Sequence, residues 1–182
     1  MLNLTCWMKN STAYAKSMKL NPKGIVIHSS GRNMPYLYYY VQPSKSDPEY
    51  DFLIKDIGYN KRHNDYNHTH RDYDFHYWIG KRKNGQVATI MTYPWYLKTW
   101  NDDFIHIFVC EDDLNNEEYL RDCLNELIYL CNMLCQHFNW DSSKIYDHSE
   151  ISNLPDINYW LKRYGYNVQL IRDRVDWLRR PL

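Results

Sequence analysis

Gly24-Ile25-Val26-Ile27-His28 is a β-branched apolar run that follows Pro22 and ends on a histidine. A short run of this kind, preceded by a helix and strand breaker, is typical of a buried strand. Loops that follow strands often carry functional side chains. The stretch therefore predicts a central strand that presents His28 at its end, beside a functional loop.

A second histidine and a later acid could join His28 in a metal site. The segment Ile145-Tyr146-Asp147-His148-Ser149-Glu150 supplies His148, and Asp156 follows eight positions after it. Two imidazoles and a carboxylate make a three-ligand zinc site with one open position, where water ionises near neutral pH. The pattern indicates a zinc hydrolase. The alternative is a packed or hydrogen-bonded histidine, which is the commoner role at a strand end in a chain with eight histidines.

Length and charge limit the class of protein. The 182 residues suffice for one core that removes about two-thirds of the unfolded surface from water. Lys and Arg together equal Asp and Glu, 22 against 22, so no global field attracts nucleic acid or an anionic membrane. We expect a single domain over residues 1–182 that binds neither, and the sequence leaves its oligomeric state open.

Targeting signals and cysteine use point to a reducing compartment. Residues 1–10 have no basic stretch followed by an apolar segment, and no later segment approaches 18 apolar residues. The five cysteines are odd in number, which favours free thiols over a disulfide framework. Cys131 and Cys135 lie near His137, but we expect them to be small apolar core residues rather than ligands of a second metal site. We expect synthesis in the cytosol.

Turn signals and periodicity predict the remaining elements. Asn84-Gly85 predicts a hairpin between residues 75–80 and 86–92, and residues 105–109 form another apolar strand. A long helix should begin after Asn115 or Asn116 and bury one face against the sheet. That face comprises Leu120, Cys123, Leu124, Leu127, Cys131, Leu134, Cys135 and Phe138.

Two shorter helices should follow, and a long loop should precede the hairpin. The helices run over residues 156–164, ending at Gly165, and over residues 168–178. Residues 29–73 read as a polar, aromatic loop around the site, with a short helix within residues 36–41. Its histidines, His63, His68 and His70, could bind metal or simply be solvated.

Several blocks together resemble one family, the type 2 zinc-dependent N-acetylmuramoyl-L-alanine amidases, which includes phage endolysins, recycling amidases and peptidoglycan recognition proteins. The blocks cover roughly residues 20–178 in the family's order. They are Pro22 to Gly31, His76-Tyr77-Trp78-Ile79-Gly80-Lys81, Thr92-Tyr93-Pro94-Trp95 with Trp100, Val109-Cys110-Glu111-Asp112 with Tyr119, His148-Ser149-Glu150, and Asn153-Leu154-Pro155-Asp156 with Trp160.

The resemblance implies an α/β domain, with a central mixed sheet flanked by helices, and a bound Zn²⁺ ion. It implies that His28, His148 and Asp156 hold the zinc, and the eight-residue interval between the last two agrees. The reaction it implies is hydrolysis of the amide between N-acetylmuramic acid and L-alanine of peptidoglycan. A bacteriolytic phage or prophage enzyme, made in the cytosol and released to the cell wall by another route, would fit.

The chain departs from the family at four polar positions. Phe108 occupies the place of a strand glutamate that many relatives carry, and Leu154 that of a lysine or histidine before the last ligand. Phe75 stands where some relatives have a tyrosine, and Asn101 follows Trp100 in place of a histidine. These changes raise the alternatives of a binding module with weak or no hydrolysis, and of a zinc amidase with a shifted substrate.

Other side chains could complete the site. Glu150 is a candidate general base, or an outer carboxylate that orients a ligand imidazole. His76 is a candidate donor to an oxyanion, and a packed histidine is the equal alternative. Trp95, Trp100 and Tyr77 are candidates for binding the glycan or the stem peptide, with a core role as the alternative.

Overall fold

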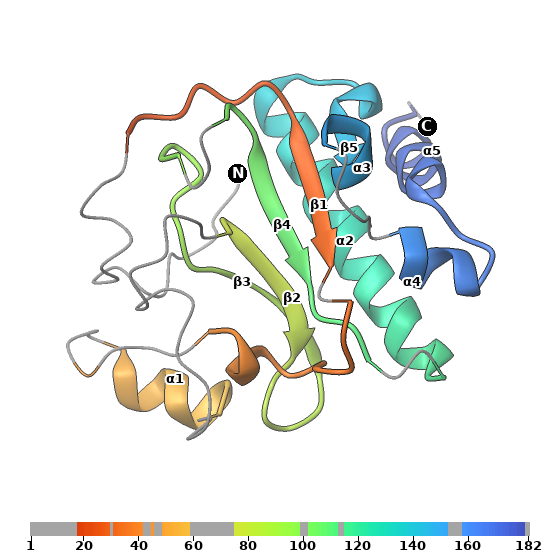
Figure 1. Ribbon diagram of the computed structural model, residues 1–182. Helices are drawn as coiled ribbons and strands as arrows, with labels where there is room; N and C mark the ends of the chain where they lie inside the picture. Colours follow the sequence, from red (N-terminus) through yellow and green to blue (C-terminus); the bar gives the residue numbers. More distant parts are fainter. Residues whose placement is uncertain are drawn as a thin grey trace.

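A five-stranded mixed sheet forms the centre of the molecule, in the order β3-β2-β4-β1-β5 (Figure 1). The computed structural model describes residues 18–29, 31–41, 45, 49–58, 75–98, 102–112, 115–152 and 158–180. Its strands are β1 (Ile25–Ser29), β2 (Tyr77–Lys81), β3 (Val87–Met91), β4 (Ile105–Val109) and β5 (Ile145–Asp147). Its helices are η2 (Leu37–Tyr39), α1 (Tyr50–Asp56), α2 (Glu117–Phe138), η3 (Ser142–Lys144), α3 (His148–Ile151), α4 (Asn158–Arg163) and α5 (Val168–Leu178). The expected α/β domain with a mixed sheet and flanking helices is confirmed.

One face of the sheet packs against α2 and α5. Ile25 and Ile27 of β1 alternate with residues that face the other way, and both are fully buried in the cluster that α2 covers. The side chain of Asn116 caps α2 by accepting from the Tyr119 N–H at 3.0 Å. The helix ends at Asn139, whose φ of 55° suits a C-terminal cap. The expected long helix and its apolar face are confirmed.

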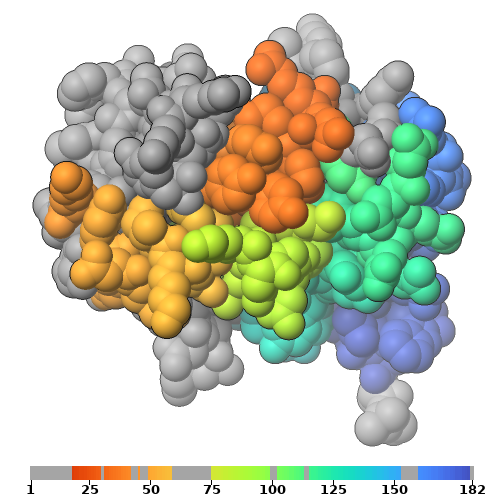
Figure 2. Space-filling view, turned by 90° about the horizontal axis from the view of Figure 1, so that it is seen from below, coloured from red at the N-terminus to blue at the C-terminus, as the bar shows by residue number. Residues whose placement is uncertain are grey.

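The opposite face of the sheet carries an aromatic cluster. It joins residues from the strands, from η2 and from α1: Leu37, Tyr40, Val41, Leu53, Ile57, Phe75, Trp78, Ile90, Phe108 and Cys110. The α1 helix is fixed to the β2–β3 turn, because Lys83 N–H donates to Asp56 O at 3.0 Å and Arg82 pairs with the Asp56 carboxylate at 3.1 Å. Figure 2 shows α1 and this turn along one side of the molecule. The sequence analysis read residues 29–73 as a loop with one short helix within residues 36–41, so it did not predict α1.

The hairpin and its turn lie where the sequence predicts them, but the Asn84-Gly85 pair does not supply two residues of positive φ. The loop is Lys83-Asn84-Gly85, closed by a hydrogen bond from Arg82 N–H to Gln86 O at 2.8 Å. Gly85 has a φ of 88°, whereas Asn84 is not among the described residues with positive φ. A three-residue hairpin loop needs a left-handed residue only at its last position. Asn84 instead accepts from the Gln86 N–H through its side chain.

The C-terminal part agrees with the sequence in outline. The α5 helix has the bounds expected, and Gly165 has the left-handed φ of 76° expected after a helix. The α4 helix lies within residues 156–164, although Asp156 itself is outside the described residues. Strand β5 and the short α3 were not foreseen. Cys110, Cys123, Cys131 and Cys135 are buried and free, as expected of core cysteines.

None of the helices in the described ranges has the length and apolar character needed to cross a membrane.

Candidate metal centre

His28 and His148 meet at the ends of two neighbouring strands. Strands β1 and β5 are parallel and pair Ile27 with Asp147, so the segments that follow them leave the sheet at the same edge. His148 follows Asp147 directly, and its ring centroid lies 4.4 Å from that of His28. The structure therefore brings together two of the three side chains expected to hold zinc. The third, Asp156, lies outside the described residues.

The environment keeps the His28 imidazole neutral. Its side chain is 6% exposed. Burial, followed by the proximity of His106 and of His148, lowers the pKa of His28 well below its ordinary value. A neutral imidazole is the form that binds a metal. Burial and the neighbouring rings thus favour the ligand-ready state at neutral pH.

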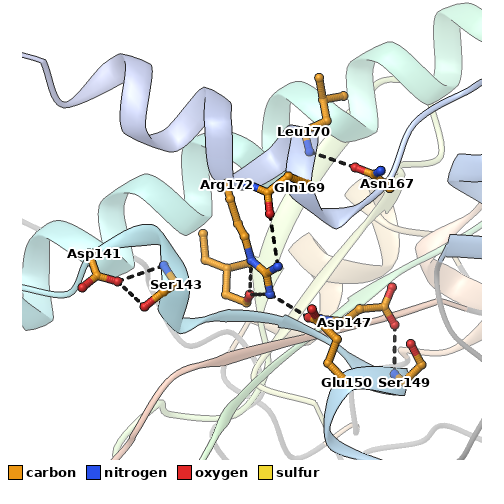
Figure 3. Close-up of polar contacts among 10 residues, drawn as sticks. Asp141, Ser143, Asp147, Ser149, Glu150, Asn167, Gln169, Leu170 and Arg172 are labelled. Atoms are coloured by element: carbon orange, nitrogen blue, oxygen red, sulfur yellow. Dashed lines mark hydrogen bonds and ion pairs between the residues drawn. The ribbon is translucent and has the colours of Figure 1, made fainter.

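A capping box fixes the turn that carries His148. The Asp147 side chain accepts from the Ser149 N–H at 3.0 Å, and the Glu150 carboxylate accepts from the Asp147 N–H at 2.8 Å (Figure 3). The two reciprocal bonds satisfy donors that a helix start leaves unpaired. They hold His148 at the first helical position of α3, beside β1.

Glu150 points toward α5 rather than toward the histidines. Its Oε2 lies 2.7 Å from the Arg172 Nη2, and Arg172 also donates to Ile145 O, so the three groups join α3, α5 and β5 (Figure 3). The α5 helix packs on the face of the sheet opposite the aromatic cluster, whose Phe75 ring lies against His28. The geometry favours a structural role for Glu150 over the general base or ligand-orienting role expected from the sequence.

Replacing Glu150 by Gln tests that role. The amide keeps an acceptor for the Asp147 N–H but loses the charge that faces Arg172. The Glu150 and Arg172 side chains are both partly exposed. We expect a loss of at most about 1 kcal/mol in the free energy of unfolding, with metal content and turnover retained. Denaturant unfolding, metal analysis and a hydrolysis assay on cell walls, the substrate that the family resemblance implies, measure the three quantities, with Glu118→Gln on the exposed face of α2 as control. Lost turnover in a stable, zinc-loaded Glu150→Gln variant would indicate that Glu150 is the general base.

His106 and Asp102 are site residues that the sequence analysis missed. His106 Nδ1 lies 2.8 Å from His28 Nε2, and His106 Nε2 lies 2.9 Å from Asp102 Oδ1. His106 is 1% exposed. Burial opposes ionisation of Asp102, but the hydrogen bond from His106 and the electrostatic interaction with that ring outweigh burial and lower the pKa of Asp102. The alternation of β4, which places His106 on the face of Phe108, was the available sequence signal.

His76 has its ring nitrogens occupied within the protein. Its Nδ1 accepts from the His106 N–H at 2.9 Å, and its Nε2 lies 2.9 Å from Leu97 O. The side chain is fully buried, and burial together with the neighbouring His106 lowers the pKa of His76 to about 3. This arrangement corresponds to the packed, hydrogen-bonded alternative. The expected oxyanion donor is not supported, because the proton on Nε2 is directed at a backbone carbonyl.

Apolar rings stand beside His28 at positions where the family that the sequence resembles carries polar groups. Phe108 is the direct partner of His28 in the β1–β4 register, and the Phe75 ring lies 5.0 Å from the His28 ring. Phe75 and Phe108 also contact each other and Trp78. These positions belong to the aromatic cluster and provide no acid–base group. Asn101 and Leu154, the other two departures, lie outside the described residues.

The two candidate substrate-binding side chains that the structure describes do not lie at this site. Tyr77 pairs with Ile107 in the sheet and is fully buried on the α2 side, so the prediction that it binds substrate is wrong. Trp95 packs against Phe138 and His137 of α2, with ring centroids at 5.1 and 5.2 Å, which matches its core alternative. Trp100 lies outside the described residues.

The donor set is compatible with zinc as far as it is described. Within the described ranges, no group of three or more His, Cys, Asp or Glu side chains is placed to hold a metal ion. His28 and His148 provide two imidazoles, the nitrogen ligands that zinc prefers, and Asp156 would have to provide the third.

Comparison with solved structures identifies the fold. A point mutant of PlyL superposes with a TM-score of 0.61 at 14% identity, covering 96% of this chain and 99% of that one. The catalytic domain of PlyG gives 0.59 at 14% identity, with 96% of both chains covered. PlyL itself gives 0.56 at 15% identity, covering 90% of this chain and 91% of that one. No family model and no curated protein sequence matches.

Proposed function

We propose that this chain is a zinc-dependent N-acetylmuramoyl-L-alanine amidase that hydrolyses peptidoglycan as a phage or prophage lysis enzyme. The observation that carries the proposal is the pair of imidazoles, His28 and His148, whose ring centroids lie 4.4 Å apart at one edge of the sheet. The fold shared with PlyL and with the PlyG catalytic domain supports the family resemblance of the sequence.

His28, His148 and Asp156 would hold the metal. When bound, zinc acts as a Lewis acid on the scissile carbonyl and makes hydroxide available near neutral pH. The chain's own residues prepare the site: burial keeps His28 neutral, and the Asp147–Glu150 capping box positions His148. The aromatic cluster around Phe75 and Phe108 lies against His28 and limits access of bulk water from that side.

A binding module of the same fold is the second candidate. The observation that favours it is Phe108, which fills the register position beside His28 and provides no group for proton transfer. A protein of this kind would bind peptidoglycan through the same edge of the sheet and release little or no product.

Solubilisation of purified cell walls separates the two candidates. The amidase should lower the turbidity of a wall suspension when zinc is present, and should lose this activity in a chelator and regain it when zinc is returned. Sedimentation of the protein with the walls measures binding in the same samples. Stoichiometric zinc and wall binding without a fall in turbidity would support the binding module instead.

A further inference from the structure

A chain of three side chains runs from the turn before β4 to the candidate metal centre. Asp102 Oδ1 is 2.9 Å from His106 Nε2, and His106 Nδ1 is 2.8 Å from His28 Nε2. Both histidines are almost completely buried, at 1% and 6% exposure. At such burial each hydrogen bond is a strong constraint, because an unpaired ring nitrogen would cost the desolvation of that group.

The chemistry of the three groups sets the direction of the hydrogen bonds. An ionised carboxylate only accepts, so the bond to Asp102 uses a proton on His106 Nε2. We take each of the two imidazoles to carry one proton. His106 Nδ1 is then an acceptor, and the proton in the bond to His28 must sit on His28 Nε2. A metal bound by His28 would therefore take the Nδ1 lone pair.

The residues around these three side chains are held by further contacts. The His106 backbone N–H donates to His76 Nδ1 at 2.9 Å, and the two rings lie nearly parallel, at 8°, with centroids 6.0 Å apart. Next to Asp102, the Asp103 carboxylate pairs with Lys23 at 2.8 Å and with Lys98 at 2.6 Å. Asp102 Oδ1 also accepts from the Phe104 N–H at 3.2 Å. The backbone of His106 and the carboxylate of Asp102 are thus both held by contacts beyond the three side chains.

We infer that Asp102 and His106 are positioning residues that hold His28 in its Nε2–H tautomer and orient it for metal binding. Ligand histidines commonly donate their second ring N–H to a carboxylate or a carbonyl, which fixes the tautomer and raises the basicity of the ligand. Here a second imidazole stands between the ligand and the carboxylate. The part that concerns metal affinity rests on the proposed function, and the part that concerns the tautomer does not.

The test uses the whole protein and two readouts. Long-range ¹⁵N–¹H spectra of the zinc-free protein at pH 8 report the protonated nitrogen of each histidine, with His28 assigned by its loss in His28→Gln. Competition with a chromophoric chelator gives the zinc Kd. The variants are His106→Phe, which keeps a ring in the buried position, and Asp102→Asn, at a partly exposed side chain. Asp103→Asn is the control, since it changes the neighbouring carboxylate and leaves Asp102, His106 and His28 in place.

We expect His28 of the wild type to carry its proton on Nε2, and His106→Phe to leave it as a mixture of tautomers. Zinc affinity should fall about 10- to 100-fold in His106→Phe and about 10-fold in Asp102→Asn, and stay near the wild type in Asp103→Asn. Asp102→Glu, which keeps the charge, should recover part of the loss. If His106→Phe does not fold, the zinc affinity of Asp102→Asn decides whether the inference holds.

Two results would overturn the inference: an Nδ1–H tautomer of His28 in the wild type, or unchanged zinc affinity in folded His106→Phe and Asp102→Asn. A wild type that binds no zinc would instead contradict the proposed function, and the tautomer measurement would still decide the role of Asp102 and His106.

Discussion

Replacing His28 or His148 by Ala should abolish stoichiometric zinc and wall hydrolysis together. The two ring centroids lie 4.4 Å apart, and His148 directly follows β5, the strand that pairs with β1. Each substitution would therefore remove a ligand from the one proposed zinc centre. Loss of a ligand should exceed the 10- to 100-fold effect of an outer partner, so we expect a fall in zinc affinity of more than about 100-fold. Metal analysis after gel filtration, with chelator competition, measures it.

The matched control for this prediction is His137→Ala. His137 lies in the last turn of α2, with its ring against Trp95 and Phe138 on the other side of the sheet. Its removal should leave zinc and turnover unchanged. One zinc per chain retained in folded His148→Ala would exclude this residue from the site, and would leave His28 and its partner His106 as the imidazoles to consider.

The largest loss of stability is expected for Trp78→Ala. The Trp78 side chain is fully buried, contacts Tyr40, Phe75 and Phe108, and donates to Thr92 Oγ1 at 2.8 Å. Truncating a buried Trp costs about 3–5 kcal/mol because of lost burial and the cavity that remains. Thermal unfolding should shift by roughly 6–20 °C, at about 2–4 °C per kcal/mol for a domain of this size.

Trp177→Ala is the control that separates burial from residue type. Trp177 lies on α5 and is 60% exposed. Its replacement should cost less than about 1 kcal/mol. Similar costs for the two substitutions would mean that the aromatic cluster around Trp78 does not support the sheet in the way its burial indicates.

The sequence was most informative where local physics decides the structure. Alternation and a glycine suited to positive φ predicted the β2–β3 hairpin, and the apolar spacing from Leu120 to Phe138 predicted α2. The capping box at Asp147 and Glu150 was also readable, since an N-cap acid followed three positions later by Glu is its signature. Read in this way, the sequence would have assigned Glu150 to the start of α3.

What escaped the sequence depends on neighbours distant in the chain. The register of β2 against β4 decides that Tyr77 faces α2, and one residue of slip would reverse it. Strand β5 has three residues, too few for a periodic signal. The bond between His28 and His106 joins two strands that are adjacent only in the folded sheet. A single sequence cannot place such partners together.

Mass spectrometry of the soluble products from a peptidoglycan digest tests the central claim most directly. The proposed function predicts free stem peptides that begin with L-alanine, together with glycan whose lactyl groups end in a carboxylic acid. Both should form with zinc, and neither with chelator or with His28→Ala. New reducing sugar ends, cleavage between amino acids of the stem, or the same products from the chelated protein would contradict a zinc-dependent N-acetylmuramoyl-L-alanine amidase.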